Sequence, residues 1–279
     1  MQVQAYAKLN LTLDILGKRE DGYHDLQMVM QSISLTDTLT ITPGQGQMDT
    51  NLTYLPSDNR NLAQMAAAAF RQATGRDIRV DISIHKHIPV CAGMAGGSSD
   101  AAAVLRALNE LTQAGLTLEQ LARIGEQVGS DVPYCVVGGT ALAEGRGEIL
   151  KALPALPACH VVVCKPPFPI STPQLFARVD TRKIVRRPDT QGLIAALERG
   201  DLADVARRMY NVFEDVLEPR RRAEIDAIKS ALIDCGALGA SMTGSGPTVF
   251  GLFDRLASAR QAAQRLGEQY REVFLTETV

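Results

Sequence analysis

The sequence predicts an α+β protein of about two domains, and three observations lead to this prediction. Segments with a two-residue apolar period and segments with helical spacing follow one another without regular alternation, which favours α+β over a doubly wound parallel sheet. The chain has 279 residues, and at roughly 150 residues per domain this length suggests about two domains. Hydrophobic residues make up 46% of the chain and charged residues 22%, as is typical of globular proteins.

The first segment of the chain predicts a half-buried strand. From Ala5 to Ile15 every odd position is apolar and the even positions are mostly polar, which is the pattern of a strand with one covered face. Lys8 and Asn10 are both at even positions. They therefore share a face of the strand, roughly 7 Å apart along it.

Three further strands and a helix are predicted before the first glycine-rich stretch. The strands cover residues 28–35, 39–42 and 79–88, and the helix covers residues 61–74 and ends before a glycine. On the last of these strands, Lys86 falls on the apolar side. Two interpretations stay open: a lysine whose ammonium group reaches solvent at a strand end, or a functional group.

Two helices follow the glycines. Apolar spacing predicts a helix over residues 101–111, and Ser98, Ser99 and Asp100 are its candidate N-caps. A capping box opens a second helix over residues 117–129.

The second half of the chain repeats the mixture of strands and helices. A hairpin is predicted near 144–148, strands at 160–164 and 272–276, helices near 191–210, 219–235 and 255–268, and a strand–turn–strand segment over 236–253. Prolines interrupt the pattern after residue 152. We therefore expect two domains, residues 1–152 and residues 153–279.

Charge and composition exclude several classes of protein. The chain carries 29 Lys+Arg against 31 Asp+Glu, a formal net charge of −2. No apolar run approaches the ~20 residues of a membrane-spanning helix, which excludes a transmembrane protein. The N-terminus lacks the basic start and apolar centre of a signal peptide, so we expect a cytoplasmic location. Five cysteines without a CxxC pair predict neither disulfides nor structural zinc.

The segment from Pro89 to Ala102, PVCAGMAGGSSDAA, predicts an anion-binding loop. It leads from a strand through three glycines and two serines into the start of a helix. A helix start offers unpaired N–H groups and a partial positive charge, and glycine lets phosphate oxygens approach the backbone. A tight turn with a serine cap would need fewer of these residues. Neither GxxxxGK[ST] nor GxGxxG occurs, which disfavours the common nucleotide folds.

Several other residues are ambiguous when taken singly. Asp131 precedes Pro133 by two residues and fits an N-cap as well as a functional carboxylate. Tyr23 and His24 fit either a solvated turn or a pair that grips a planar ring. The functional signal of residues 236–253 is weak.

Histidines and a cysteine near the loop superficially offer metal ligands. His85 and His87 alternate on one strand face, and Cys91 follows in the loop. The set lacks recognised zinc spacing, so we predict no protein metal site there.

The glycine-rich loop resembles the phosphate-binding motif of the GHMP kinase superfamily. The segments AYAKLNLTLDILGKREDGYHDL, GSDVPYC and GASMTGSGPTVFGLF resemble the family of these kinases that acts on 4-diphosphocytidyl-2-C-methyl-D-erythritol. The resemblance spans residues 5 to about 253. It implies a two-domain GHMP kinase fold, with an N-terminal domain like ribosomal protein S5 domain 2, a ferredoxin-like C-terminal domain and an active site in the cleft between them.

The resemblance also implies an activity and a set of site residues. The enzyme would use ATP and Mg2+ to phosphorylate the substrate's 2-hydroxyl in the non-mevalonate isoprenoid pathway. Lys8 and Asp131 would be the catalytic pair, with Asp131 receiving the hydroxyl proton and Lys8 keeping it ionised. Residues expected at the nucleotide are Asn61, Lys86, Pro89, Val90, Cys91, Ala92, Gly93, Met94, Ala95, Gly96, Gly97, Ser98 and Ser99. Residues expected at the acceptor substrate are Asn10, Tyr23, His24, Pro173 and Phe176.

The loop departs from the family pattern at three positions. Many members have glycine where this chain has Cys91 and Ala95, and leucine where it has Met94. Alanine does not easily take the positive φ that glycine adopts. A thiol near a helix N-terminus is also a candidate for reaction with thiol reagents, against which ATP would protect.

Two alternative functions stay open. Another GHMP kinase, acting on homoserine or a mevalonate derivative, would use the same loop, but it would not need the GYH turn that suits a cytosine. An RNA-binding module would use the basic clusters at 182–187, 207–208 and 220–222, but the chain is net acidic and only 5% aromatic. We expect a small-molecule substrate, no nucleic-acid or membrane partner, and a monomer or homodimer.

Overall fold

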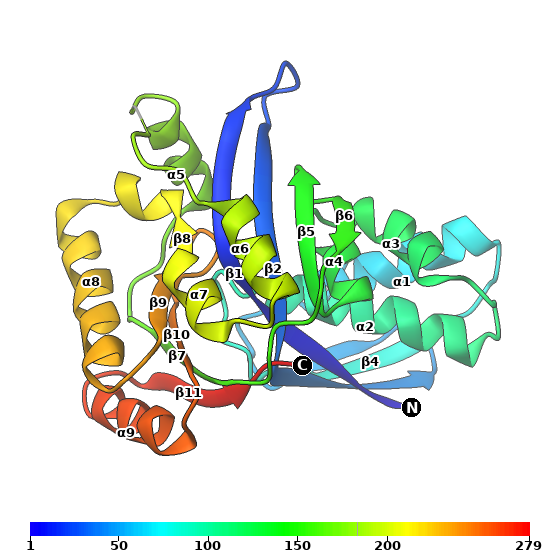
Figure 1. The fold of residues 1–279 in the computed structure, drawn as a ribbon. Helices are drawn as coiled ribbons and strands as arrows, with labels where there is room; N and C mark the ends of the chain where they lie inside the picture. The colour runs from blue at the N-terminus through cyan, green and yellow to red at the C-terminus, as the bar shows by residue number, and fades with distance from the viewer. Residues whose placement is uncertain (183) are drawn as a thin grey trace. The chain divides into compact units, whose positions relative to one another are not determined.

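The computed structural model describes residues 1–182 and 184–279 and confirms the α+β class (Figure 1). The chain divides into two compact units. The first unit comprises residues 1–7, 35–88 and 95–138, and the second unit comprises residues 8–34, 89–94 and 139–279. Lys183, in the basic cluster 182–187, lies outside the described residues. The expected domain boundary at residue 152 stays a prediction.

Strands and helices are labelled as in Figure 1. The strands are β1 (Gln2–Lys18), β2 (His24–Pro43), β3 (Met48–Thr50), β4 (Val80–His85), β5 (Thr140–Gly145), β6 (Ile149–Ala152), β7 (His160–Lys165), β8 (Tyr210–Asn211), β9 (Gly239–Met242), β10 (Val249–Phe253) and β11 (Glu272–Glu277). The α-helices are α1 (Leu62–Thr74), α2 (Gly96–Leu111), α3 (Leu118–Glu126), α4 (Val132–Val137), α5 (Thr172–Val179), α6 (Thr190–Glu198), α7 (Leu202–Arg208), α8 (Pro219–Asp234) and α9 (Leu256–Gly267), and η1 (Val212–Val216) is a 3-10 helix. Among the described residues, every helix is too short or too polar to cross a bilayer.

The first unit combines strands with a cluster of helices. The second half of β2 pairs antiparallel with β4, with Thr38 opposite His85, and β3 pairs parallel with β4. Helices α1 to α4 pack on one another, as Figure 1 shows. Helix α2 is buried along most of its length, and its alanines let the neighbouring helices approach closely.

The second unit contains β1 from Lys8 onward, the first half of β2 and the strands from β5 to β11. Within it, β1 pairs parallel with β8, and the first half of β2 pairs antiparallel with β5, which continues into β6. A separate antiparallel sheet has the order β11-β7-β10-β9, and helices α8 and α9 pack on it. Strand β7 is apolar at consecutive positions because residues 161–164 are all buried.

Local patterns predicted many elements correctly. Asn61 caps α1 and Gly75 ends it with φ 66°, as the spacing indicated. Thr117 and Gln120 form the expected capping box at the start of α3. The hairpin of β5 and β6, the strands β7 and β11, the β9–β10 segment and the helices α8 and α9 also lie where the sequence placed them.

The strand predictions need three corrections. The prediction that β1 is only half buried is wrong, because Lys8 and Asn10 are buried together with the apolar positions. The two strands predicted over 28–42 form one strand, β2, since residues 36–38 contain no glycine or proline to end it. Strand β4 ends before Lys86, whose amide and carbonyl bond to the side chain of Asn51 instead of a neighbouring strand.

Helix boundaries also differ from the predictions. Helix α2 begins at Gly96, so Ser98, Ser99 and Asp100 are not N-caps but lie within its first turns. Helix α3 ends at Glu126, before the predicted end at residue 129. The helix predicted over 191–210 is two helices, α6 and α7, separated at a glycine, and α5 was not predicted.

Candidate active site

The loop between β4 and α2 has the backbone of an anion-binding turn. Cys91, Gly93 and Ala95 have φ angles of 53°, 73° and 58°, all in the left-handed region. The loop delivers the chain into α2, whose first backbone N–H groups have no intrahelical acceptor. Consecutive turns of this kind direct amide hydrogens toward one side, which suits a phosphate group.

Glycines in this region are required by close contacts. A Cβ at Gly93 would lie 2.2 Å from the carbonyl oxygen of Thr243. A Cβ at Gly96 would lie 3.3 Å from Nζ of Lys86. At Gly93 a side chain would clash with this carbonyl oxygen, so the loop conformation there depends on glycine, whereas at Gly96 the neighbouring side chains would have to move by only a few tenths of an ångström.

Ser99 serves the fold of the first unit. Its hydroxyl donates to the carbonyl oxygen of Tyr6 and lies 3.4 Å from Sγ of Cys135. Ser99 is buried in the first turn of α2. These bonds anchor the start of the helix that follows the loop.

A buried group of charged residues lies behind the start of α2. Nζ of Lys86 is 2.6 Å from Oδ2 of Asp100 and also bonds Oδ2 of Asp37. Burial acts to lower the pKa of Lys86, but Asp100 and Asp37 outweigh it and raise that pKa. Burial raises the pKa of Asp100 to about 7, against the opposing charge of Lys86.

Lys8 and Asn10 lie together on β1, as the two-residue period indicated. Nζ of Lys8 donates to Oδ1 of Asn10 at 2.6 Å, and the amide of Lys8 donates to the carbonyl oxygen of Met94 at 3.2 Å. The amide of Asn10 donates to Oγ1 of Thr243 at 3.0 Å, and Thr243 also bonds the carbonyl oxygen of Gly93. In the second unit, β1 is thus tied to the first part of the loop.

Thr243 contacts the predicted loop but was not predicted from the sequence. It lies in the segment MTGSG, to which the pattern gave only a weak functional signal. The adjacent Gly244 has φ 57°, and a Cβ there would lie 2.7 Å from the carbonyl oxygen of Gly93. The available signal was this second run of glycines, whose small size permits contact with the loop.

Asp131 stands at the N-cap position of α4, directly before the first helical residue. Its carbonyl oxygen accepts from the amide of Cys135 at 3.0 Å. Within the described part of the chain, its carboxylate makes no capping hydrogen bond to the helix. Lys8 belongs to the second unit and Asp131 to the first, so their pairing stays a prediction.

Two of the residues predicted at the acceptor substrate are in contact. The rings of His24 and Phe176 are stacked, with centroids 4.6 Å apart and an interplanar angle of 19°. Nε2 of His24 lies 2.7 Å from Oδ1 of Asp180, and hydrogen bonds from Lys18 and His24 lower the pKa of Asp180. Asp180 was not predicted, because no local pattern marks it.

Tyr23 and Pro173 are also in the second unit. Tyr23 is 56% exposed, and the guanidinium of Arg146 lies 5.2 Å from the centroid of its ring. Pro173 is in the first turn of α5, the helix that carries Phe176. The exposed ring of Tyr23 offers a face on which a planar base can stack.

Asn61 has a structural role, and its predicted place at the nucleotide stays a prediction. Its Oδ1 accepts from the amide of Ala63 at 3.0 Å, and its Nδ2 donates to the carbonyl oxygen of Pro56 at 2.9 Å. These bonds cap α1 and hold the preceding loop.

Cysteine, histidine and acidic side chains are the residues that could ligate a metal ion in this protein. All five cysteines are free, and Cys91 is exposed whereas the other four are buried. Across residues 1–182 and 184–279, no three His, Cys, Asp or Glu side chains gather as metal ligands. Mg2+ usually binds through one or two carboxylates together with substrate phosphates.

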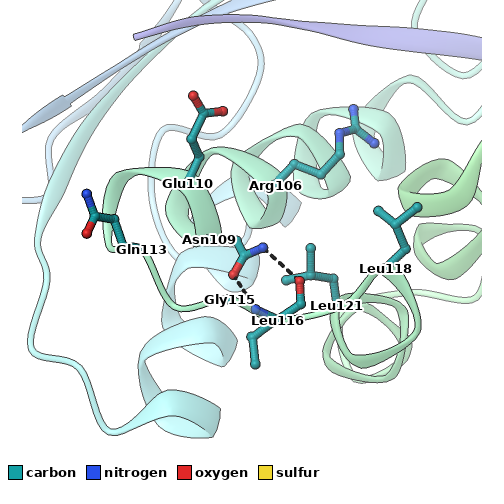
Figure 2. A pocket seen from close by; sticks show the side chains of 8 residues that line it. All are labelled: Arg106, Asn109, Glu110, Gln113, Gly115, Leu116, Leu118 and Leu121. Atoms are coloured by element: carbon teal, nitrogen blue, oxygen red, sulfur yellow. Dashed lines mark hydrogen bonds between the residues drawn. The ribbon is translucent and has the colours of Figure 1, made fainter.

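A groove of about 510 Å³ lies elsewhere on the first unit, between α2 and the start of α3 (Figure 2). Among the lining residues, the side chain of Asn109 bonds both the amide and the carbonyl oxygen of Leu116, each at 2.9 Å. All the lining residues lie between Arg106 and Leu121, C-terminal to the predicted loop.

Comparisons with known proteins match the chain to the GHMP kinases. The family model described as "GHMP kinases N terminal domain" matches residues 61–139, and "GHMP kinases C terminal" matches residues 193–272. The chain is 42% identical over 281 residues to a 4-diphosphocytidyl-2-C-methyl-D-erythritol kinase of Clostridium botulinum (strain Alaska E43 / Type E3), and 44% identical to that of Clostridium kluyveri, covering 100% of each chain. A crystal structure of 4-(cytidine 5'-diphospho)-2C-methyl-D-erythritol kinase is 33% identical, with a TM-score of 0.83 and coverage of 100% of this chain and 99% of that one.

Proposed function

Because the chain belongs to the 4-diphosphocytidyl-2-C-methyl-D-erythritol kinase family of GHMP kinases, we propose that it phosphorylates that compound at its 2-hydroxyl group. The phosphoryl donor is ATP, and the products are ADP and the 2-phosphate, an intermediate of the non-mevalonate isoprenoid pathway. The observation that carries the proposal is the loop of residues 89–95, which enters the N-terminus of α2 with three left-handed residues.

The nucleotide binds at this loop. Backbone amides of the loop and of the first turn of α2 receive the phosphates, and Asn61 and Lys86 belong to the nucleotide site. Mg2+ bound to the phosphates of ATP would offset their negative charge. Thr243 supports this arrangement by holding the carbonyl oxygen of Gly93.

Asp131 and Lys8 carry the chemistry. The bond between the γ-phosphorus and the bridging oxygen of ADP breaks as a bond forms from the γ-phosphorus to the substrate's 2-hydroxyl oxygen. The hydroxyl proton passes to the carboxylate of Asp131. Lys8, whose ammonium is held by Asn10 at 2.6 Å, stabilises the developing negative charge on the oxygen.

The acceptor substrate is bound through its cytosine and its methylerythritol. Tyr23 and Phe176 stack on the cytosine, His24 bonds its edge, and Pro173 lies nearby. Asn10 contacts the methylerythritol portion. Stacking supplies affinity, and the edge contacts discriminate between bases.

The test is an ADP-release assay with ATP, Mg2+ and a panel of acceptors. We expect turnover with 4-diphosphocytidyl-2-C-methyl-D-erythritol and none with homoserine, mevalonate or phosphomevalonate. Turnover with one of the latter would assign a different GHMP kinase activity. Salt-sensitive retention of RNA without any turnover would replace the kinase by an RNA-binding module.

The catalytic base is tested by Asp131→Asn. This variant should fold normally and lose turnover, because an amide does not accept the hydroxyl proton. The exposed Asp254 supplies the matched control, Asp254→Asn, which should keep wild-type turnover. Near-normal turnover of Asp131→Asn would exclude Asp131 as the base.

A further inference from the structure

Three charged side chains are enclosed in the first unit at the point where the loop begins and ends. Asp37, Lys86 and Asp100 are 0%, 9% and 3% exposed. Lys86 makes an ion pair with each carboxylate, and the distance from Nζ to Oδ2 of Asp100 is 2.6 Å. We call these three residues the ion cluster.

Asp37 holds the chain just before the loop. Its Oδ1 accepts from the amides of His87 and Ile88, at 2.5 Å and 2.8 Å, while its Oδ2 bonds Lys86. The three consecutive residues 86–88 are therefore fixed to β2. Ile88 is the last residue before the loop.

Asp100 holds the chain just after the loop. It is the fifth residue of α2, one turn beyond Gly96. A Cβ at Gly96 would lie only 3.3 Å from Nζ of Lys86, so the ammonium group packs directly against the first residue of the helix. The bond between Lys86 and Asp100 therefore joins the start of α2 to the end of β4.

The side chain of Lys86 faces the two carboxylates in the interior. Its side chain is only 5% exposed, and both of its ion-pair partners are themselves buried. A lysine that offered its ammonium group to a phosphate would have to leave this cluster, and two buried carboxylates would then lack their cation.

We infer that Lys86 is a positioning residue, which with Asp37 and Asp100 clamps the two ends of the nucleotide loop at the separation that phosphate binding requires. The inference rests on the proposed binding of ATP at this loop and refines it. Lys86 acts on the nucleotide through the loop backbone rather than by touching it.

Because the three side chains are buried and charged, four variants test this inference. Lys86→Met leaves two carboxylates without a cation and so disturbs the clamp. Asp100→Leu removes one partner, whereas Asp100→Asn keeps the shape and an oxygen that accepts from Lys86. The combined variant Lys86→Met/Asp37→Asn/Asp100→Leu replaces the ion cluster by neutral groups, which interiors tolerate far better than an unpaired charge.

The measurement is ADP affinity by calorimetry, with the KM values for ATP and for the acceptor. We expect Lys86→Met and Asp100→Leu to weaken ADP binding by roughly tenfold to a hundredfold, since small displacements of binding groups have effects of this size. Asp100→Asn and the combined variant should bind ADP within about threefold of wild type. The KM for ATP should rise more than the KM for the acceptor. Lys151→Met, at an exposed lysine of β6, is the matched control and should change nothing.

Each outcome decides between positioning and contact. If Lys86 touches the nucleotide, the combined variant should bind ADP as weakly as Lys86→Met does, and Asp100→Leu should bind ADP as tightly as wild type. Either result would overturn the inference. If the combined variant does not fold, as judged by circular dichroism, the comparison of Asp100→Leu with Asp100→Asn decides alone. Wild-type protein that neither binds ADP nor turns over ATP would instead refute the proposed function.

Discussion

Replacing Asp100 by Asn should change how the stability of the protein depends on pH. In the folded protein, Oδ2 of Asp100 lies 2.6 Å from the ammonium of Lys86. Its Oδ1 is buried and, among the described residues, has no hydrogen-bond partner. Burial accordingly raises the pKa of Asp100 to about 7 from its ordinary value of 3.8, although Lys86 opposes the rise.

The sign and size of the effect follow from these two pKa values. Between pH 3.8 and about 7 the folded protein keeps the proton of Asp100 and the unfolded chain releases it. Since the unfolded state binds fewer protons, the free energy of unfolding falls as the pH rises through this range and levels off above it. The folded and unfolded pKa values of Asp100 differ by about three pH units. At about 1.4 kcal/mol per pH unit, the free energy of unfolding should fall by roughly 4 kcal/mol in total.

Urea unfolding of wild type and Asp100→Asn at several pH values measures this effect. The stability of the variant relative to wild type should increase by about 1.4 kcal/mol per pH unit between about pH 5 and pH 6.5, and become constant above about pH 8. Asp254→Asn, at an exposed position, should show a curve parallel to wild type. Parallel curves for Asp100→Asn and wild type would refute the reasoning, because Asp100 would then titrate alike in both states.

Three further predictions concern the loops and the acceptor site. Ala95→Gly should stabilise the protein by about 0.5–1 kcal/mol in thermal unfolding, because relief of the left-handed strain at φ 58° outweighs the greater conformational freedom of glycine in the unfolded chain. Gln113→Gly, at φ 50°, should stabilise the protein similarly without affecting ADP binding. Unchanged melting temperatures would contradict both predictions. Alkylation of the exposed Cys91 should inactivate the enzyme unless ATP is present, whereas full activity of the alkylated protein would show that Cys91 is remote from the nucleotide. Asp180→Ala should raise the KM for the acceptor and leave the KM for ATP unchanged, because His24 loses the bond of 2.7 Å that orients its ring; an equal rise in both KM values would point to a general loss of structure.

Local signals predicted the parts of the fold that local chemistry controls. The period of β1 placed Lys8 and Asn10 on one face, and their side chains are bonded at 2.6 Å. The caps of α1 and the capping box of α3 were also read correctly, because each depends on residues within one turn of the helix.

Contacts between residues distant in the chain could not be predicted from local sequence patterns. The burial of both faces of β1 depends on elements distant in the chain, so the alternation of apolar residues gave the wrong expectation for Asn10. Asp37 bonds residues about fifty positions later, and no sequence pattern marks it as their partner. The start of α2 was misplaced because Ser98, Ser99 and Asp100 are good caps by type. In the structure Ser99 bonds Tyr6 and Cys135, and Asp100 bonds Lys86.

The ion cluster accounts for the presence of non-glycine residues at left-handed positions of the loop. Cys91 and Ala95 are both left-handed without being glycine, and each costs about 1–2 kcal/mol in that conformation. Such strain persists only where surrounding contacts fix the backbone, and the ion cluster fixes it on both sides. It follows that Ala95→Gly should restore part of the ADP affinity that Lys86→Met loses, because a loop with less strain depends less on its clamp. Calorimetry on the single and double variants tests this coupling, and strictly additive effects on the binding free energy would show that strain and clamp are independent.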